Sequence, residues 1–259
     1  MTPTAEDWQD FARRKEPQLL QVCRSLDLKH LASPRDLPDA LLLHQTSRLQ
    51  VYYAPFGLQR PRVVPLLMVG LTPGFAQARL AYEAWQQADG DRERYESLFN
   101  RNVVFAGPTR LNLIRYLDDI GVADALQLPT AAELFTTRQD LMAAYSMLRY
   151  PVFVGSELRN YGGTDAAHKD PWLQSMIQHL FLAHVQRQSR QTLIVPMGKY
   201  PGRVLRELAG QDPTLEARTL WGFPHTSGSN GHRHAQFLAG RDLFRQKVAA
   251  WKQSLARAT

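Results

Sequence analysis

Residues 66–75, with the sequence LLMVGLTPGF, constrain the fold of this chain more than any other stretch. Residues 66–69 form an uninterrupted apolar run of strand length, and the glycine-containing residues 70–74 break the chain before a helical pattern begins. In α/β proteins such a turn lies at the carboxyl edge of the sheet, where ligands bind. A strand–turn–helix junction without a ligand has the same pattern, so this stretch by itself predicts a fold rather than a function.

Further apolar runs of strand length recur along the chain, each followed by a glycine-containing loop and then, in most cases, by a helical pattern. We predict strands at residues 51–53, 151–155, 192–195 and 219–221, and helices at 38–48, 76–88, 92–100, 111–121, 171–188, from 204 onward and 234–256. Strands that alternate with helices favour a parallel sheet covered on both faces. We therefore expect one α/β domain over residues 1–259, a three-layer sandwich with a central, mostly parallel four-stranded sheet. Residues 1–60 are expected to form a helical extension packed on this core.

The charge balance favours a polyanionic partner. The 259 residues contain 31 Lys and Arg against 24 Asp and Glu, a formal charge of +7. A single cysteine, Cys23, excludes an intrachain disulfide and a multi-cysteine metal site. The N-terminal residues lack the apolar stretch of a signal peptide, and no apolar run approaches membrane-spanning length. We expect a cytoplasmic protein with no membrane contact.

Two of the glycine-containing segments carry the pattern of a known family. The turn at residues 70–74 reads GLTPG, and residues 225–228 read HTSG. In this order, and over residues 66–233, the sequence resembles the uracil-DNA glycosylase superfamily, whose first motif is similar to G-x-x-P-G and whose second usually reads H-P-S. The resemblance implies the fold described above and a monofunctional DNA glycosylase that leaves an abasic site.

The resemblance also implies roles for individual residues. His225 would donate a hydrogen bond to the departing base, and Thr72 stands where relatives place a carboxylate or amide that positions water. A threonine hydroxyl orients water but is no base near neutral pH. The remaining base-pocket candidates are Gly70, Leu71, Pro73, Gly74, Phe75, Trp85, Gly155, Ser156, Glu157 and Asn160.

The amide that reads uracil in relatives aligns with Gly155 or Ser156, and Asn160 takes that place if the alignment slips. A small residue there enlarges the pocket, and Glu157 can accept a hydrogen bond from a cytosine amino group. We therefore expect a modified pyrimidine as substrate, such as the glucosylated hydroxymethylcytosine of viral DNA, and a role in antiviral defence. The candidate DNA-contacting residues are Thr109, Arg110, Lys199, Tyr200, Arg203, Ser227, Asn230, His232 and Arg233, of which Asn230, His232 and Arg233 are the candidates to fill the gap left by a flipped base.

Other readings of the same residues stay open. His225 can be an ordinary turn histidine, Trp85 and Phe75 can be core residues, and Asp165 with His168 can be an acid–base pair or solvated side chains. A uracil-excising repair enzyme, a non-catalytic DNA-binding module and a protein that binds a small phosphorylated ligand are the alternative functions. We expect DNA as the partner, a monomer, and neither cofactor nor metal, because no cysteine or nearby carboxylate completes a ligand set around His225, His232 and His234.

Overall fold

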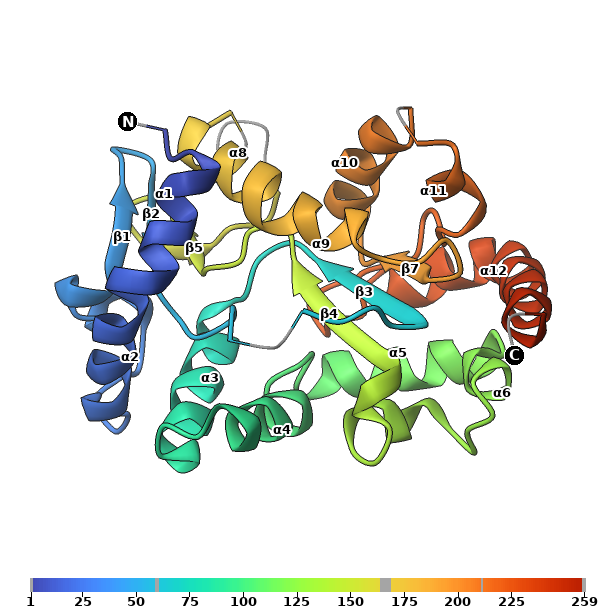
Figure 1. Ribbon diagram of the computed structural model, residues 1–259, viewed down its shortest axis with the longest axis horizontal. Helices are drawn as coiled ribbons and strands as arrows, with labels where there is room; N and C mark the ends of the chain where they lie inside the picture. The colour runs from blue at the N-terminus through green and yellow to red at the C-terminus, as the bar shows by residue number, and fades with distance from the viewer. Residues whose placement is uncertain (1, 59–60, 164–168, 211, 258–259) are drawn as a thin grey trace. The chain divides into compact units, whose positions relative to one another are not determined.

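The computed structural model describes residues 2–58, 61–163, 169–210 and 212–257. The chain divides into two compact units, which are described separately (Figure 1). Unit 1 comprises Met1–Pro61, Leu71–Val103 and Ser146–Gln186, and unit 2 comprises Arg62–Gly70, Val104–Tyr145 and Arg187–Thr259. The chain passes between them several times, so neither unit is a continuous stretch of sequence.

Unit 1 combines an antiparallel sheet with helices. Its described helices are α1 (Ala5–Asp10), η1 (Phe11–Lys15), α2 (Glu16–Ser25), η2 (Pro34–Asp36), η3 (Asp39–Leu41), α3 (Phe75–Ala88), α4 (Arg92–Asn102), α8 (Pro171–Met176), η6 (Ile177–Phe181) and α9 (Leu182–Gln186). Its strands are β1 (Leu42–Gln45), β2 (Leu49–Tyr52), β5 (Val152–Val154) and β6 (Arg159–Asn160), in the order β1-β2-β5-β6, with each neighbouring pair antiparallel.

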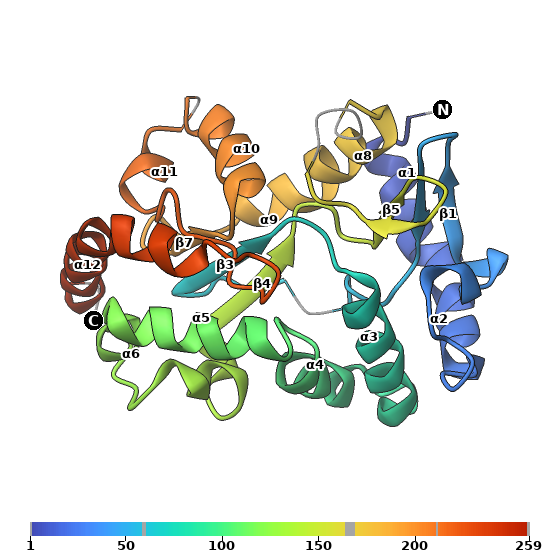
Figure 2. The same ribbon diagram turned by 180° about the vertical axis from the view of Figure 1, so that it is seen from behind.

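Unit 2 is built on a three-stranded sheet in the order β4-β3-β7. Its strands are β3 (Leu66–Gly70), β4 (Met142–Ser146, whose last residue belongs to unit 1) and β7 (Leu193–Pro196). Its described helices are α5 (Pro108–Asp119), α6 (Val122–Ala125), η4 (Ala131–Phe135), η5 (Gln139–Leu141), α10 (Lys199–Ala209), α11 (Thr214–Ala217) and α12 (Arg233–Ala256). β3 and β7 pair in parallel, and all residues of both are buried. Full burial is typical of a parallel strand covered on both faces, and α10 and α5 lie on opposite sides of this sheet (Figures 1 and 2).

Local sequence explains the helix boundaries. The Asp91 carboxylate accepts hydrogen bonds from Glu93 N and Arg94 N and so begins α4. Helix α12 buries Phe237, Phe244, Val248 and Trp251, whose spacing places them on one face.

The α/β class is confirmed, but the arrangement of strands differs from the expectation. Residues 151–155 do contain a strand, yet β5 belongs to the antiparallel sheet of unit 1. The neighbour of β3 is instead β4, which we did not predict because its sequence, MAAYS, has the composition of a helix. The predicted strand near Thr219 is reduced to one parallel bridge between Thr219 and Ile194.

The helix predicted over residues 38–48 is wrong. These residues form η3 and β1, and β1 turns back into β2. The Thr46 hydroxyl oxygen accepts hydrogen bonds from Arg48 N and Leu49 N, which stabilises the reversal. The short apolar run before it is ambiguous between helix and strand, and pairing with β2 decides for the strand. Residues 1–60 thus include two strands of the unit 1 sheet.

Candidate active site

His225 has a defined tautomer in unit 2. Its Nδ1 lies 3.3 Å from the backbone N–H of Ser227, which can only donate, so Nδ1 accepts and the ring proton of the neutral imidazole is on Nε2. Burial lowers the pKa of His225. His225 is therefore a neutral hydrogen-bond donor at physiological pH.

The loop around His225, residues 223–230 (the histidine loop), is fixed by helix α5 and by side chains of the loop itself. Asn112 of α5 donates to the Thr226 carbonyl at 3.0 Å, and the buried Thr226 hydroxyl donates to the Thr109 carbonyl at 2.9 Å. Asn230 donates to the His225 carbonyl at 2.9 Å. Figure 2 shows the segment before α12 beside α5. The backbone of the histidine loop is thus held on both sides of the imidazole.

The loop after β7 meets the histidine loop. Gly198 N donates to the Phe223 carbonyl at 3.0 Å, and Met197 N donates to the Val69 carbonyl at 2.8 Å. Gly198 has φ +95°, and a Cβ there would lie 3.3 Å from the Cβ of His225. The carboxyl ends of β3 and β7 and the histidine loop therefore converge in unit 2, as the topology of a parallel sheet predicts.

The proline–glycine turn after Gly70 is in unit 1, and its contacts there are specific. Leu148 N donates to the Leu71 carbonyl at 2.9 Å, and the Thr72 hydroxyl donates to the Tyr150 carbonyl at 3.0 Å. Because the Thr72 proton is used in this bond, the hydroxyl oxygen can accept a hydrogen bond from water but cannot donate one to it. Pro73 is buried within the turn.

Asn160 lies at the start of α3. Its amide oxygen accepts from Phe75 N at 2.9 Å, and a Cβ on Gly74 would lie 3.4 Å from its amide nitrogen. The Phe75 ring meets the Phe153 ring edge-on at 6.5 Å. The structure thus brings three of the pocket candidates, Asn160, Gly74 and Phe75, together in unit 1.

Other pocket candidates lie elsewhere in unit 1. Trp85 is a core residue whose indole N–H donates to the Leu20 carbonyl and whose ring packs on Tyr95. It is ten residues beyond Phe75, about 15 Å along the helix, so its assignment to the pocket is wrong.

Gly155, Ser156 and Glu157 form the exposed turn between β5 and β6. Gly155 has φ +73°, and Glu157 pairs with Arg35 at 3.0 Å with most of its side chain in solvent. We expected the strand at residues 151–155 to lead into a helix, with these three residues at the carboxyl edge of a parallel sheet. Instead β5 and β6 form an antiparallel hairpin, so the assignment of these residues to a pocket at that edge is wrong.

Some candidate DNA-contacting side chains pack inside unit 2, and others are exposed to solvent. Arg110 is wrongly assigned, since its guanidinium bonds the Val104 carbonyl and lies 4.6 Å over the Phe135 ring, and burial lowers its pKa. Tyr200 is buried, with the Arg203 guanidinium 5.1 Å over its ring. The exposed members are Lys199, Arg203 and His232.

Two further candidates serve the histidine loop itself. Ser227 and Ser229 share a hydroxyl hydrogen bond of 2.9 Å, and Arg233 donates to the Asn230 carbonyl at 2.9 Å. Gly70 and the histidine loop belong to unit 2. Leu71, Thr72 and the other pocket candidates belong to unit 1.

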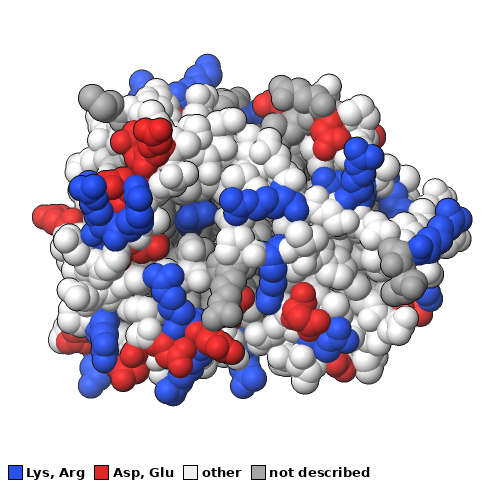
Figure 3. All heavy atoms as spheres, viewed as in Figure 1, with Lys and Arg blue, Asp and Glu red and all other residues white. Residues whose placement is uncertain are grey.

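The excess positive charge is confined to unit 2. Unit 2 contains 16 Lys and Arg against nine Asp and Glu, whereas unit 1 contains 15 of each. In unit 1, for example, the cations over η1 stand beside acidic side chains, as Asp10 pairs with Arg14 at 2.8 Å (Figure 3). In unit 2, residues 104–117, 187–206 and 217–241 contain no Asp or Glu. These acid-free segments include the histidine loop.

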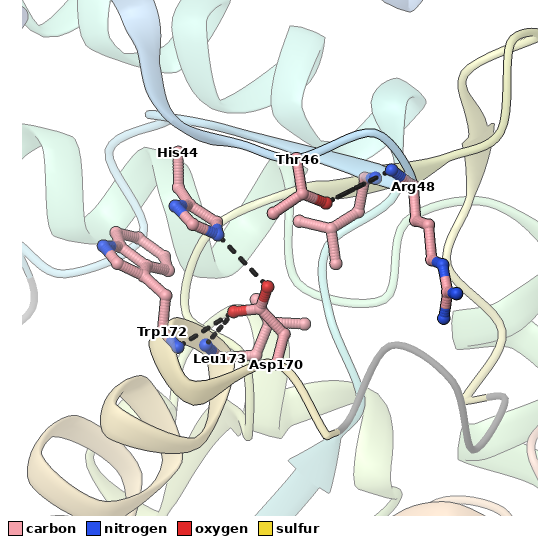
Figure 4. Close-up of polar contacts among 7 residues, drawn as sticks. His44, Thr46, Arg48, Asp170, Trp172 and Leu173 are labelled. Carbon is pink, nitrogen blue, oxygen red and sulfur yellow. Dashed lines mark hydrogen bonds and ion pairs between the residues drawn. The ribbon is translucent and has the colours of Figure 1, made fainter. Parts of the chain in front are cut away.

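A second polar cluster, which the sequence analysis missed, lies in unit 1 (Figure 4). His44 Nε2 lies 3.2 Å from Asp170 Oδ2, and the His44 ring stacks parallel to Trp172 at 5.1 Å. The other carboxylate oxygen of Asp170 accepts from the backbone N–H groups of Trp172 and Leu173. Pairing of residues 126 apart leaves no local signal in the sequence. The cluster joins β1 to the start of α8.

The described residues hold no group of three His, Cys, Asp or Glu side chains arranged to bind a metal ion. Nor does the described part of the chain contain a helix long and apolar enough to cross a membrane. Asp165 and His168 lie outside the described residues.

Comparison with known proteins identifies a relative. The chain is 32% identical over 219 residues to the uncharacterized protein YoxB of Bacillus subtilis (strain 168), and the alignment covers 83% of this chain and 85% of YoxB. The chain belongs to the YoxB family. The match runs over most of both chains rather than over one embedded motif. No protein-family model and no solved structure matches the chain.

Proposed function

We propose that this protein is a monofunctional DNA glycosylase related to the uracil-DNA glycosylase superfamily. The observation that carries the proposal is the tautomer of His225, whose Nδ1 accepts from Ser227 N and whose Nε2 therefore carries the proton. The pKa of His225, lowered by burial, keeps the ring neutral. A neutral donor held in a rigid loop suits a reaction in which negative charge develops on a leaving base.

The chemistry follows from that donor. The bond between C1′ of the sugar and N1 of a pyrimidine breaks, and its electron pair stays on the base. His225 Nε2–H donates a hydrogen bond to the base O2 as the charge accumulates, and keeps its proton. Water then adds its oxygen to C1′, and the proton it loses goes to the departing base. The products are free base and an abasic site, and no lysine nucleophile is required.

The charge of unit 2 supports DNA as the substrate. Its acid-free segments surround the histidine loop, and Lys199 and Arg203 are exposed there. A positive surface lowers the free energy of polyanion binding and makes it salt-dependent. We further propose that the sheet β4-β3-β7, extended by the Thr219 bridge, corresponds to the four-stranded core of a glycosylase, and that the protein acts as a cytoplasmic monomer.

A modified pyrimidine of viral DNA remains our proposed substrate, with defence as the role, and uracil in a repair role is the alternative. The Asn160 oxygen is taken by Phe75 N–H, so the amide offers a base its N–H donors rather than a free acceptor. Donors suit the oxygen atoms of a hydroxymethylated or glucosylated base.

One observation favours a second function. The Thr72 proton is committed to the Tyr150 carbonyl, and threonine cannot act as a base. A non-catalytic DNA-binding module is consistent with that arrangement, and it predicts salt-sensitive binding without product.

The experiment is a release assay on duplex DNA that contains uracil, 5-hydroxymethylcytosine, glucosylated hydroxymethylcytosine or only ordinary bases. We expect free base, detected by mass spectrometry, and alkali-labile strands from at least one modified duplex. Binding to all four duplexes without any released base would instead establish the binding module.

A further inference from the structure

The segment of residues 218–221 in unit 2 concentrates buried polar atoms that lack a partner. Arg218 Nε, Thr219 Oγ1 and Trp221 Nε1 are all buried, and no described residue forms a hydrogen bond with any of them. Trp221 is only 7% exposed, and its indole N–H can donate but cannot accept. Native proteins rarely bury a polar atom unless a protein group, a water molecule or an ion satisfies it. Three such atoms within four residues therefore indicate a place that binds something from outside the chain.

Two cations from neighbouring helices lie beside this segment. The Arg206 guanidinium of α10 lies 4.8 Å over the Trp221 ring. Lys247 Nζ of α12 donates to the Thr219 carbonyl at 2.9 Å and to the Glu216 carbonyl at 2.8 Å. Figures 1 and 2 show α11, which contains Glu216, between α10 and α12. Two helices and the segment thus contribute to one cluster of hydrogen-bond donors in unit 2.

Neither cation forms an ion pair with a described carboxylate. Arg206 is exposed, and its guanidinium makes no hydrogen bond with any residue that the structure describes. Burial lowers the pKa of Lys247, the Glu216 carboxylate opposes that shift, and the positive charge of Arg206 adds to it. Arg206 is therefore close enough to repel the ammonium group. Two like charges at a partly buried position are stabilised when an anion binds to both.

The chemistry of these groups selects the class of ligand. Arg206 has five N–H donors, Lys247 has one N–H left beyond its two carbonyl bonds, and Trp221 has one. Two positive charges match the charge of a terminal phosphate group, which approaches −2 at neutral pH, and its three oxygens can accept from all of these donors. A carboxylate has one charge and two oxygens, so it would leave one cation unpaired.

We propose that Arg206, Lys247 and Trp221 bind the terminal phosphate group of a small molecule. The guanidinium and the ammonium pair with the phosphate oxygens, and the indole N–H donates to one of them. Trp221 Nε1 is closed to solvent, so Arg206, the exposed side chain over the ring, rotates toward the phosphate and lets an oxygen reach the N–H. The site contains no residue of the histidine loop and does not depend on the proposed function.

The test is NMR of the ¹⁵N-labelled tryptophan indoles in the full chain, titrated at constant ionic strength with inorganic phosphate, adenosine 5′-monophosphate or acetate. Inorganic phosphate, the monophosphate or both should move the Trp221 indole resonance, which Trp221→Phe identifies. The Trp251 resonance should stay in place, because its N–H already donates to the Gln191 carbonyl at 2.7 Å. The ligand that binds more tightly shows whether the site takes free phosphate or a phosphate ester. Acetate should move neither resonance.

Variants measured by calorimetry assign the contacts. Arg206→Ala and Lys247→Ala should each weaken phosphate binding at least about tenfold, the effect of one lost charge-assisted hydrogen bond. The matched control is Lys252→Ala, which removes the same charge from α12 where the ammonium pairs with Asp124 at 2.6 Å, and it should retain the wild-type affinity. Trp221→Phe should also weaken binding, because it removes the N–H and keeps an aromatic ring under Arg206.

Three outcomes would overturn the site. The first is an unmoved Trp221 resonance at millimolar phosphate and monophosphate, and the second is equal loss of affinity in Lys247→Ala and Lys252→Ala. The third is a response to duplex DNA without terminal phosphates but to neither small ligand, which would assign this surface to DNA binding. An equal response to acetate would overturn the selection of phosphate over a carboxylate. Because Arg206 is exposed, Arg206→Ala keeps the core of unit 2 and tests the site even if Trp221→Phe does not fold.

Discussion

Replacement of Gly198 by alanine tests how tightly the loop after β7 positions His225. Gly198 has φ +95°, where an L residue is strained by about 1–2 kcal/mol. The added Cβ would also lie 3.3 Å from the Cβ of His225, so the histidine must move by a few tenths of an ångström. Gly222 has φ +84° with no atom within 4 Å of an added Cβ, which makes Gly222→Ala a control for backbone strain alone.

Both variants should therefore lose about 1–2 kcal/mol of unfolding free energy, or roughly 2–4 °C in melting temperature for a chain of this size. Only Gly198→Ala should shift the imidazole ¹⁵N resonances of His225. If His225 is the donor to the leaving base, Gly198→Ala should also slow base release about fivefold, since displacement by a full ångström costs on the order of a hundredfold.

The assays are thermal denaturation, histidine-selective NMR and single-turnover base release. Equal resonance shifts in the two variants would refute the claim that Gly198 is required by its contact with His225. A stability loss confined to Gly198→Ala would refute the assignment of backbone strain at both positions.

Two further predictions concern unit 1. Burial raises the pKa of Glu16, whose carboxylate accepts from the Tyr53 hydroxyl at 3.2 Å, so its stabilising contribution is complete below pH 4.5 and is lost as pH rises through the higher folded-state pKa. Glu16→Gln should therefore flatten the decline of unfolding free energy above pH 4.5 in urea titrations, and an unchanged profile would contradict a buried, ionising Glu16. Asp170→Ala should cost about 1–2 kcal/mol in urea denaturation, because two backbone donors lose their cap. The loss should exceed that of Asp91→Ala, whose cap holds no histidine, and equal losses would show that the contact with His44 contributes nothing.

The sequence predicts best where local patterns and burial agree. β3 and β7 are continuous apolar runs, and α3, α4 and α12 have boundary residues or an apolar face that identify them, so their existence and approximate bounds follow from the chain alone. β4 and β1 were missed because their composition does not distinguish strand from helix, and each is decided by the strand beside it.

The candidate site shows the same difference between features set by local sequence and features set by long-range contacts. Turns after parallel strands are expected at the carboxyl edge of the sheet, and in unit 2 the turn after β7 does bring Gly198 against His225. Gly155, Ser156 and Glu157 were misplaced because a strand followed by a glycine reads alike in parallel and antiparallel sheets. Arg110 was wrongly predicted to contact DNA, because the sequence shows its charge but not where its side chain points. Its guanidinium donates a hydrogen bond to the Val104 carbonyl.

The most direct test of the central claim is the single-turnover rate of base release at saturating DNA for wild type, His225→Ala and His30→Ala. His30 is an exposed histidine of unit 1 whose ring nitrogen Nδ1 lies 2.7 Å from the Asp27 carboxylate, so its replacement should leave the rate unchanged. Loss of the Nε2–H donor should slow release by about 10²–10³-fold while DNA affinity changes little. Base release by His225→Ala at the wild-type rate would contradict the assignment of His225 as the donor to the leaving base.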